Sequence, residues 1–359
     1  MQKNLTGKTV VVGMSGGVDS SVCALLLKKQ GATVIGLHML SENKATANDD
    51  KNRVISICDK LGIKCEIVDY KSEMQVVKDY FIETYKKGQT PNPCVICNRE
   101  VKFKPFVEYV EKLNADFFAT GHYAKIEHDD NKHYLKCAVD TKKDQSYFLC
   151  QLSQKQLSKA LFPLGELTKD EVKKLAEENG LSFEGVKESQ DICFLGTEKF
   201  KEFMNKNYPE KSGDIVDVNS DKVVGKHSGI SKYTLGQRKG LGIGGGHGTT
   251  GESWAVTGKD IEKNIVYVCQ GDENILYSKA LLTADVNWIP EKPEGSFDCF
   301  VRYRHAQSLQ QAKVELKNDN TALVRFYEKQ RAISKGQYAV FYKDGYCLGG
   351  GVIAETYSD

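Results

Sequence analysis

Short apolar runs alternate with helical hydrophobic patterns through the first third of the chain. Four runs rich in apolar, β-branched or aromatic residues are expected to be strands: 9–12, 33–37, 64–68 and 116–120. Between and after them, apolar side chains recur every three or four positions, which predicts helices over 18–30, 47–61, 72–86 and 99–113. Strands that alternate with helices indicate a parallel α/β sheet, which is the fold class we expect for the N-terminal part.

The rest of the chain has a different pattern. Beyond Pro209 the helical periodicity fades, and strand-like segments separated by Gly, Asn and Asp dominate. Alternating runs at 297–303, 312–316, 321–327 and 338–342 predict a small antiparallel β-barrel. A chain of 359 residues exceeds the usual size of one core. We therefore expect three domains: an α/β catalytic domain over 1–207, a small β-rich central domain over 208–280 and a C-terminal β-barrel over 281–359.

Composition and charge narrow the class of protein. Hydrophobic residues make up 40% and charged residues 27%, as in soluble globular proteins, and a net charge of +2 gives no overall basic field for nucleic acid. No apolar run approaches the ~20 residues that span a bilayer, and the N-terminus lacks a signal-peptide core. We expect a cytoplasmic protein that does not bind membranes, with its eleven dispersed cysteines mostly reduced.

A loop rich in glycine and serine, residues 13–21, follows the first predicted strand and opens the first predicted helix. Gly16 and Gly17 lack a β-carbon, so the backbone can turn with positive φ and bring its amides close to an anion. The N-terminus of the helix also favours negative charge. An ordinary strand-to-helix turn is the alternative, but strand, loop and helix together indicate a phosphate site.

The loop does not have the Gly-Lys-Ser/Thr ending of a Walker A loop and contains no lysine, which argues against a kinase or a motor ATPase. Its order Ser-Gly-Gly-x-Asp-Ser instead resembles the pyrophosphatase loop of enzymes that split ATP into AMP and pyrophosphate. That resemblance implies that the loop grips the pyrophosphate end of ATP and that Asp19 helps to hold Mg²⁺.

A proline-rich stretch follows the third predicted helix. Pro91 and Pro93 disfavour a helix, so we expect an extended loop, after which Asn98 caps a helix that begins at Arg99. Cys97 would then lie beside a helix N-terminus and the Arg99 cation, both of which favour a thiolate. A rigid loop with incidental cysteines is the alternative.

Cys94 and Cys97 have the spacing of one half of a zinc site, but tetrahedral zinc needs a second pair of ligands. Cys137 and Cys150 lie too far apart in the sequence to form such a pair, so we expect no zinc and no other metal centre built from side chains alone. Cys193 lies at the junction of a polar and an apolar segment. A buried cysteine in a short strand is the alternative reading of that residue.

Gly121 and His122 follow the fourth predicted strand. Because the carboxyl ends of parallel strands meet at one edge of a sheet, we expect both residues beside the phosphate loop. His122 can polarise a carbonyl or hold a phosphate, or it can be a structural histidine. Farther on, Thr168 and Glu171 have the spacing of a capping box at the start of another helix, whose charged side chains we expect to be solvated.

Other polar and basic residues are candidates for RNA contact. The stretch Lys143-Asp144-Gln145 presents hydrogen-bonding groups before an apolar helical run, or else it caps that helix. The segment 232–247 combines cations with flexible glycines, and Arg302-Tyr303 combines a cation with an aromatic ring, as RNA-binding surfaces do. A surface loop and a solvated strand face are the respective alternatives.

Taken in order, these motifs resemble the tRNA-specific 2-thiouridylases over the whole chain. The resemblance rests on Gly13 to Ser20, Asn92-Pro93-Cys94, Cys97-Asn98, Gly121-His122-Tyr123, Lys143-Asp144-Gln145, Ile192-Cys193-Phe194, Gly236 to Gly246 and Arg302-Tyr303. No single one of these motifs suffices. The family commonly has aspartate where this chain has Cys94, which leaves open what Cys94 contributes to base contact and redox chemistry.

The resemblance implies a fold of the adenine nucleotide alpha-hydrolase type and a defined reaction. ATP would adenylate the 2-oxygen of the wobble uridine of tRNA, and sulfur from a cysteine persulfide would replace that oxygen, with release of AMP and pyrophosphate. Cys193 is implied as the persulfide carrier, loaded by a sulfur-relay protein or a cysteine desulfurase. Cys97 is implied as the other catalytic thiol, which closes a disulfide with Cys193 as sulfur is released.

The resemblance also implies two sets of binding residues. ATP would be bound by Gly13, Met14, Ser15, Gly16, Gly17, Val18, Asp19, Ser20, Met39 and Gly121. The tRNA would be bound by Asn92, Pro93, Cys94, His122, Lys143, Asp144, Gln145, Arg302, Tyr303 and Gln337. Met39 would meet the adenine through its backbone, and a core methionine is the alternative. We expect a monomer.

Three other functions use the same residues differently. An iron–sulfur-dependent tRNA thiolase would bind a cluster through Cys94, Cys97 and Cys193, which iron analysis of anaerobically purified protein would reveal. An amide-forming adenylating ligase would use the same loop but needs no paired cysteines. A tRNA-binding sulfur carrier without catalysis would release no pyrophosphate.

Overall fold

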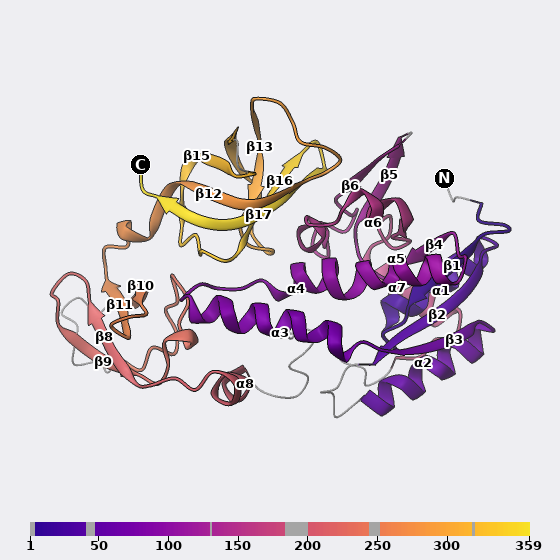
Figure 1. Cartoon of the computed structure of the whole chain (residues 1–359), viewed down its shortest axis with the longest axis horizontal. Coiled ribbons are helices and arrows are strands. Elements are labelled where there is room, and N and C mark those ends of the chain that lie inside the picture. Colours follow the sequence, from indigo (N-terminus) through magenta and orange to yellow (C-terminus); the bar gives the residue numbers. More distant parts are fainter. Residues whose placement is uncertain (1–3, 41–46, 130, 184–199, 244–251, 318–319) are drawn as a thin grey trace.

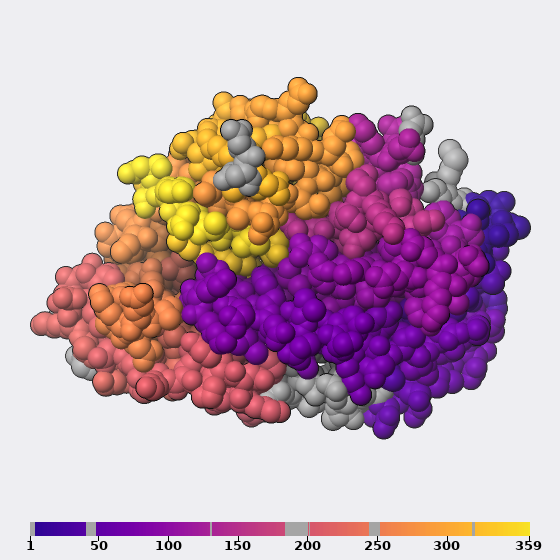
Figure 2. Space-filling view, in the orientation of Figure 1, coloured from indigo at the N-terminus to yellow at the C-terminus, as the bar shows by residue number. Residues whose placement is uncertain are grey.

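A computed structural model describes residues 4–40, 47–129, 131–183, 200–243, 252–317 and 320–359 (Figure 1). Within these ranges the strands form sheets of five, four and eight strands. The N-terminus lies beside β1 at one end of the molecule, and the C-terminus lies beside the last strands toward the other end. The surfaces of the three parts adjoin in the space-filling view (Figure 2).

The first sheet is parallel, in the order β3-β2-β1-β4-β7. Its strands are β1 (Thr9–Gly13), β2 (Thr33–Leu40), β3 (Lys64–Asp69), β4 (Phe117–Ala119) and β7 (Ala160–Leu161). Val10 and Val12 pack in one hydrophobic cluster and Val11 in another, because helices cover both faces of the sheet. The predicted α/β alternation is confirmed. The strand order reverses at β1 and β4, where ligands bind in such sheets.

The helices of this part pack on both faces of the sheet. They are α1 (Val18–Lys29), α2 (Ala47–Leu61), α3 (Lys71–Lys86), α4 (Pro93–Ile96), α5 (Lys104–Lys112), α6 (Gln154–Lys159), α7 (Lys169–Glu178) and α8 (Phe200–Asn207). A π-helical segment, η1 (Cys97–Phe103), joins α4 to α5, and a 3-10 turn, η2 (Ser146–Leu149), precedes α6. α1, α2 and α7 cover the face of Val10, and α3 and α5 cover the face of Val11. In the described ranges, no helix has the length and apolar character needed to cross a membrane.

The central sheet has the order β10-β11-β8-β9. Its strands are β8 (Gly213–Asp217), β9 (Val223–His227), β10 (Trp254–Asp260) and β11 (Ile265–Gln270). β8 and β11 are parallel, and the other neighbours are antiparallel. Ile215, Val256 and Val266 lie in a hydrophobic cluster of this sheet, so the central part has a small core of its own, as the sequence predicts.

The last strands form a closed antiparallel barrel. They are β12 (Tyr277–Trp288), β13 (Ser296–Arg302), β14 (Gln310–Leu316), β15 (Ala322–Arg331), β16 (Tyr338–Lys343) and β17 (Tyr346–Tyr357). β12 pairs with both β15 and β17, which closes the ring. Val301, Val324 and Phe341 are among the apolar side chains that fill the interior. The predicted C-terminal barrel is confirmed.

A hairpin from the N-terminal part, β5 (Lys125–Asp129) and β6 (Lys132–Lys136), extends the barrel sheet. Leu135 and Lys136 pair with Cys347 and Tyr346 of β17. The ammonium of Lys136 also lies 4.3 Å from the ring centroid of Tyr346, a favourable cation–π geometry. Main-chain hydrogen bonds therefore join the barrel to the N-terminal part, a junction that the sequence pattern did not indicate.

Lys259 on β10 gives the central sheet a pH dependence. Its Nζ donates to the Tyr233 carbonyl (2.9 Å), and burial lowers the pKa of this lysine from 10.5 to about 8, against a smaller opposing effect of Glu210. Below pH 8 Lys259 is charged in the folded protein, and the burial of this charge lowers the free energy of unfolding. The free energy of unfolding rises again between pH 8 and 10.5, because in this range the unfolded chain binds more protons than the folded one.

We expect Lys259→Met to raise the free energy of unfolding at pH 7 by about 2 kcal/mol, since each unit of pKa shift corresponds to about 1.4 kcal/mol and the Tyr233 hydrogen bond is lost. The gain should shrink as the pH rises above 8. Urea unfolding followed by tryptophan fluorescence at pH 7 and pH 9.5 measures both effects. Lys263→Met, at a lysine that is 68% exposed, is the control. A gain that does not change with pH would contradict this account.

Candidate functional site

The predicted phosphate loop, residues 13–21, runs from the end of β1 into the first turn of α1 at the carboxyl edge of the first sheet. Met14 is fixed to the neighbouring strand β2. Its N–H donates to the Leu37 carbonyl (2.8 Å), and the carbonyl of Met14 lies 2.8 Å from Nδ1 of His38. Gly16 has a φ of +80°, which glycine adopts without steric cost. The turn is therefore held in a defined place on the sheet.

The serine side chains bond within the loop. The N–H of Ser15 donates to Ser20 Oγ (3.2 Å), and the hydroxyls of Ser20 and Ser21 donate to the carbonyl of Gly17 (3.1 and 2.9 Å). Gly17 is the N-cap residue of α1 and has no side chain to bond the first N–H groups of that helix. Those N–H groups and the positive end of the helix dipole suit an anion.

Two other elements approach the loop closely. A β-carbon built on Gly121, after β4, would lie 2.9 Å from the carbonyl carbon of Asp19 and 3.0 Å from the nitrogen of Ser20. From α2, Nη1 of Arg53 lies 3.6 Å from the place of a β-carbon on Gly16. The predicted meeting of the loop with Gly121 is confirmed, and α2 adds a cation beside it.

Asp19 is the centre of a polar cluster beside the loop. Nζ of Lys169, the first residue of α7, lies 2.8 Å from both carboxylate oxygens, and the Tyr123 hydroxyl donates to Oδ1 (2.8 Å). The side chain of Lys169 is 9% exposed, whereas that of Asp19 is 34% exposed. The carboxylate is therefore the more accessible member of the ion pair.

Lys169 is a site residue that no motif in the sequence marks. The capping box of Thr168 and Glu171 forms as predicted, but the expectation that the charges of this helix are solvated is wrong for Lys169, which is buried. Its partner lies 150 residues away, so no local pattern shows the pairing. One local signal existed: a lysine at the first position of a helix opposes the helix dipole and needs an anion nearby.

The donors around Asp19 suit an ion pair better than a dedicated magnesium site. Mg²⁺ demands near-octahedral oxygen ligands, whereas both oxygens of Asp19 face the Lys169 ammonium. Among the described residues, no group of three or more His, Cys, Asp or Glu side chains is placed to hold a metal ion.

The cysteine pair lies on a helix, and the expected extended loop is wrong at this point. α4 begins at Pro93, because proline is tolerated at the first helical position, where an N–H has no partner in any case. The helix N-terminus therefore lies beside Cys94, which is exposed, and not at Arg99 as expected. Cys97 is one turn farther in and 3% exposed. A π-helical segment, a feature frequent at functional sites, begins at Cys97.

Asn98 and Arg99 make tertiary contacts. Asn98 lies inside η1, where its Nδ2 donates to the Phe148 carbonyl (3.1 Å), so it does not cap a helix as expected. The guanidinium of Arg99 donates to Glu100 (2.8 Å) and to Gln151 (2.9 Å). These contacts fix the start of η1 against the segment that leads into α6.

His122 lies near both the phosphate loop and η1. Its Nδ1 is 2.7 Å from Thr120 Oγ1, and its ring packs 5.7 Å from Phe103 of η1 and 6.0 Å from Phe162. Burial, with a smaller effect of the nearby Lys102 charge, lowers the pKa of His122 well below its usual 6.5. His122 is therefore neutral at pH 7 and can hydrogen-bond an uncharged group, but it does not supply a positive charge.

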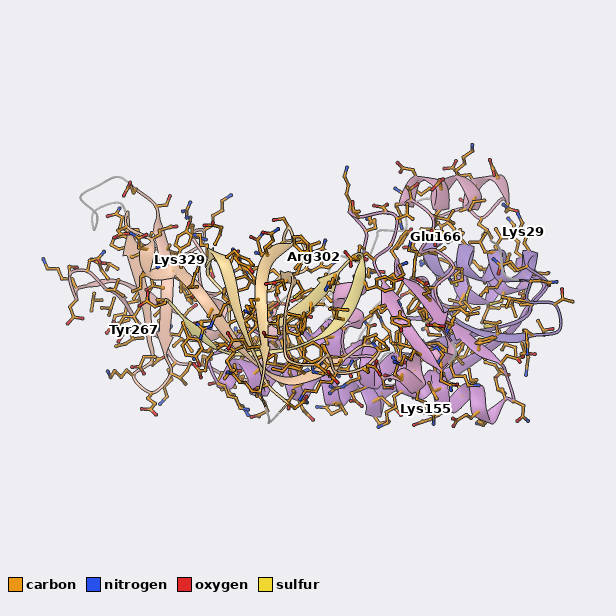
Figure 3. The ribbon with its side chains drawn as sticks, turned by 90° about the horizontal axis from the view of Figure 1, so that it is seen from above. Lys29, Lys155, Glu166, Tyr267, Arg302 and Lys329 are labelled. Carbon is orange, nitrogen blue, oxygen red and sulfur yellow. The ribbon has the colours of Figure 1, made fainter. Side chains whose placement is uncertain are left out.

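A polar stretch before η2 joins the site to the barrel. The N–H of Tyr123 donates to Gln145 Oε1 (3.0 Å), and the N–H of Gln145 donates to the Tyr123 carbonyl (2.8 Å). Next to it, Asp144 accepts from Nη1 of Arg302 (3.2 Å), whose guanidinium lies over the ring of Tyr342. Figure 3 shows Arg302 among the barrel strands. These contacts run without interruption from Asp19 to the barrel.

A second junction lies before α4. Nε2 of Gln337, in the turn before β16, donates to the carbonyls of Thr90 (3.1 Å) and Pro91 (2.8 Å). Nδ2 of Asn92, which is buried, lies 3.5 Å from Gln337 Oε1. Two residues implied as tRNA-binding are thus neighbours although they are 245 positions apart in the chain.

The implied site residues thus fall into three groups. The loop, Gly121 and His122 lie together; Asn92, which precedes Pro93 and Cys94, lies against Gln337; and Asp144 lies against Arg302. Tyr303 is buried in the barrel core, and Met39 is partly buried near the end of β2. Cys193 and the 244–247 end of the glycine-rich segment lie outside the described residues.

We expect Arg302→Met to lower the free energy of unfolding by about 3 kcal/mol, because it leaves the buried Asp144 carboxylate without its cation. The double variant D144L/R302M, with no charge left in place, should recover much of that loss. Urea unfolding measures both, with Lys317→Met at an exposed ion pair as the control. Unchanged stability in Arg302→Met would contradict a stabilising role for this pair.

Models of known protein families match all three parts of the chain. The model described as the tRNA methyl transferase HUP domain matches residues 8–197, the tRNA methyl transferase PRC-barrel domain matches 201–270, and the aminomethyltransferase beta-barrel domain matches 278–353. Together with the three sheets, these matches confirm the predicted fold class, with an N-terminal sheet of the adenine nucleotide alpha-hydrolase type.

Curated relatives match nearly the full length. The tRNA-specific 2-thiouridylase MnmA of Alkaliphilus oremlandii is 46% identical, with 98% of this chain and 99% of the relative covered. Relatives of the same name from Staphylococcus epidermidis and Geobacillus thermodenitrificans are also 46% identical, covering 98% and 97% of this chain and 96% and 95% of their own lengths. The chain therefore belongs to the family of tRNA-specific 2-thiouridylases, which are sulfurtransferase enzymes.

Proposed function

We propose that this protein catalyses the ATP-dependent 2-thiolation of the wobble uridine of tRNA. The observation that carries the proposal is the match to tRNA-specific 2-thiouridylases over 98% of the chain. The geometry supports it, because a phosphate loop at a helix N-terminus and a cysteine-bearing helix lie on the same parallel sheet. An activated oxygen and a sulfur nucleophile are the two requirements of the reaction.

The first step is the transfer of AMP from ATP to the base. The 2-oxygen of uridine attacks the α-phosphorus, the bond to the bridging oxygen breaks, and pyrophosphate leaves. The loop amides and the positive end of α1 hold the pyrophosphate and offset its charge. The backbone of Met39 meets the adenine, and Gly121, which has no β-carbon, lets the start of α1 lie close to the end of β4. Part of the charge on the ATP phosphates would be offset by the Mg²⁺ that ATP carries.

The second step replaces the activated oxygen with sulfur. The terminal sulfur of a Cys193 persulfide attacks C2 of the base, and AMP leaves with the oxygen. The Cys97 thiolate then attacks Sγ of Cys193, so that the sulfur–sulfur bond to the base breaks and its electron pair stays on the base sulfur. The products are 2-thiouridine and a Cys97–Cys193 disulfide, which a two-electron thiol reductant must open before the next cycle.

The tRNA is proposed to lie over both junctions between the N-terminal part and the barrel. Asn92, Pro93, Cys94 and His122 would face the target base, which must leave its stack to reach the cysteines. The stretch 143–145 with Arg302, Tyr303 and Gln337 would form or support the surface for the rest of the RNA. The burial of Asp144 and Tyr303 favours support of that surface over direct contact by their side chains.

Sulfur must come from a donor protein, for which a sulfur-relay protein or a cysteine desulfurase is proposed. We also propose that the protein acts as a monomer in the cytoplasm. Size-exclusion chromatography with light scattering, with and without tRNA, tests whether the protein is a monomer.

Incubation with ATP, Mg²⁺, a persulfide donor and unmodified tRNA, followed by nucleoside mass spectrometry, tests the proposed function. We expect 2-thiouridine at the wobble position with one AMP and one pyrophosphate per sulfur, and no product without ATP. A tRNA with cytidine at that position is the matched control. Absence of 2-thiouridine with an active donor would refute the proposal, and activity that depends on bound iron would favour the cluster-dependent mechanism.

A further inference from the structure

The phosphate loop has no positively charged side chain of its own, although the pyrophosphate that it is proposed to bind is strongly negative. Residues 13–21 contain no lysine or arginine, and their one charged side chain is the carboxylate of Asp19. Pyrophosphate carries several negative charges, so an unpaired Asp19 beside it would repel it. Loops of the Walker type solve this problem with a lysine of their own. Here positive charge must come from other parts of the chain. Arg53 of α2 lies near Gly16 but pairs with Asp50 (3.0 Å), whereas Lys169 of α7 pairs with Asp19 of the loop itself.

Lys169 is well placed to supply positive charge to the loop. Its Nζ lies 2.8 Å from both oxygens of Asp19, and the side chain is 9% exposed. Its backbone is fixed as well, because its N–H donates to Asp140 Oδ2 (2.9 Å) at the capped start of α7. The ammonium is therefore held beside the loop by α7 and not by a flexible surface segment.

Stability alone does not explain a lysine in this place. Taking the Lys169 ammonium out of water is unfavourable, and apolar replacements of buried ion pairs are often neutral or stabilising. The packing of α7 is already provided by Val172 and Ala176, which lie in the same core cluster as Val22 of α1. Core packing therefore explains the position of α7, but it does not explain why residue 169 carries a positive charge.

We propose that Lys169 is a ligand of the pyrophosphate end of ATP. It pairs with Asp19 while the loop lacks a nucleotide, and it shares its ammonium between Asp19 and the β- and γ-phosphate oxygens when ATP binds. An ammonium has three N–H donors and forms strong hydrogen bonds to both carboxylate and phosphate. This inference rests on the proposed function, in which the loop holds the pyrophosphate of ATP.

Calorimetric titration of Lys169→Met with ATP, pyrophosphate and AMP tests the assignment. We expect affinity for ATP and pyrophosphate to fall 10- to 100-fold, as for loss of a hydrogen bond between charged groups, and affinity for AMP to change less than threefold. Lys169→Arg should keep most of the pyrophosphate affinity. Lys174→Met, at an exposed lysine on the same helix, is the matched control and should bind all three ligands normally.

The outcomes separate this inference from the function on which it rests. Normal pyrophosphate affinity in Lys169→Met, or an equal loss for AMP and ATP, overturns the assignment of Lys169 even if the wild-type protein makes 2-thiouridine. A wild-type protein that binds ATP but makes no 2-thiouridine refutes the function, while the titrations still test Lys169. If Lys169→Met does not fold, Lys169→Gln, which keeps a polar side chain without the charge, takes its place with the same expected losses.

Discussion

Cys97→Ser should reduce the formation of 2-thiouridine by at least about 10³-fold while ATP binding stays within twofold of wild type. A serine hydroxyl does not form a disulfide, so the sulfur–sulfur bond of the intermediate on the base cannot be broken by exchange. ATP binding should persist, because the loop is built by β1, β2 and α1, whereas Cys97 is the first residue of η1. Nucleoside mass spectrometry and ATP titration measure the two effects.

Cys65→Ser, at a partly buried cysteine of β3, is the matched control and should keep full activity. Cys193→Ser should behave like Cys97→Ser. If both serine variants keep most of their turnover, the sulfur mechanism is wrong and an amide-forming ligase becomes the better reading of the loop. Residual activity in Cys97→Ser that disappears in the double variant C94S/C97S would instead show that the exposed Cys94 thiol can take over the exchange.

Gly121→Val should abolish measurable ATP binding, with affinity at least about 100-fold weaker. Even a single β-carbon there would lie 2.9 Å from the backbone of Asp19, closer than side-chain carbons normally approach, and the start of α1 would have to move. Such overpacking against main chain typically costs 1–3 kcal/mol, and here the strain falls on the groups that would hold the pyrophosphate. Isothermal titration with ATP measures the loss.

Gly225→Ala on β9 is the control, since a β-carbon there meets only ordinary contacts of 3.5 Å or more. It should bind ATP like the wild-type protein. If Gly121→Val folds and binds ATP normally, the nucleotide does not occupy the edge of the sheet where the loop and Gly121 meet. Circular dichroism distinguishes that result from a loss caused by unfolding.

Local sequence patterns determine the parts of the fold that could be predicted. The strands of the first sheet and the helices around it have strong hydrophobic periods, and the structure places them within a few residues of the predicted ranges. The hairpin of β5 and β6 was not predicted to join the barrel, because register between distant strands leaves no local trace. The helix at Pro93 does not follow from the sequence pattern, because proline disfavours a helix interior but is well tolerated at the first helical position.

The site could be predicted only in part for the same reason. The loop, Gly121 and the cysteine pair carry their own signatures in adjacent residues. Lys169 and the pairing of Asp144 with Arg302 depend on contacts across 150 and 158 positions, respectively. A resemblance to a family transfers only the residues that its motifs name, so an ion pair outside those motifs becomes visible only in the folded chain.

The contact between β6 and β17 also bears on how the chain folds during synthesis. Lys136 and Tyr346 are 210 residues apart, so at about 5–20 residues per second the partner of β6 is made roughly 10–40 s later. During that time β6 is an open sheet edge, and the charged Lys132, Lys136 and Glu127 on the hairpin are the type of residue that discourages edge-to-edge association. β17, synthesised some 210 residues after β6, thus covers an edge that the hairpin leaves open until then.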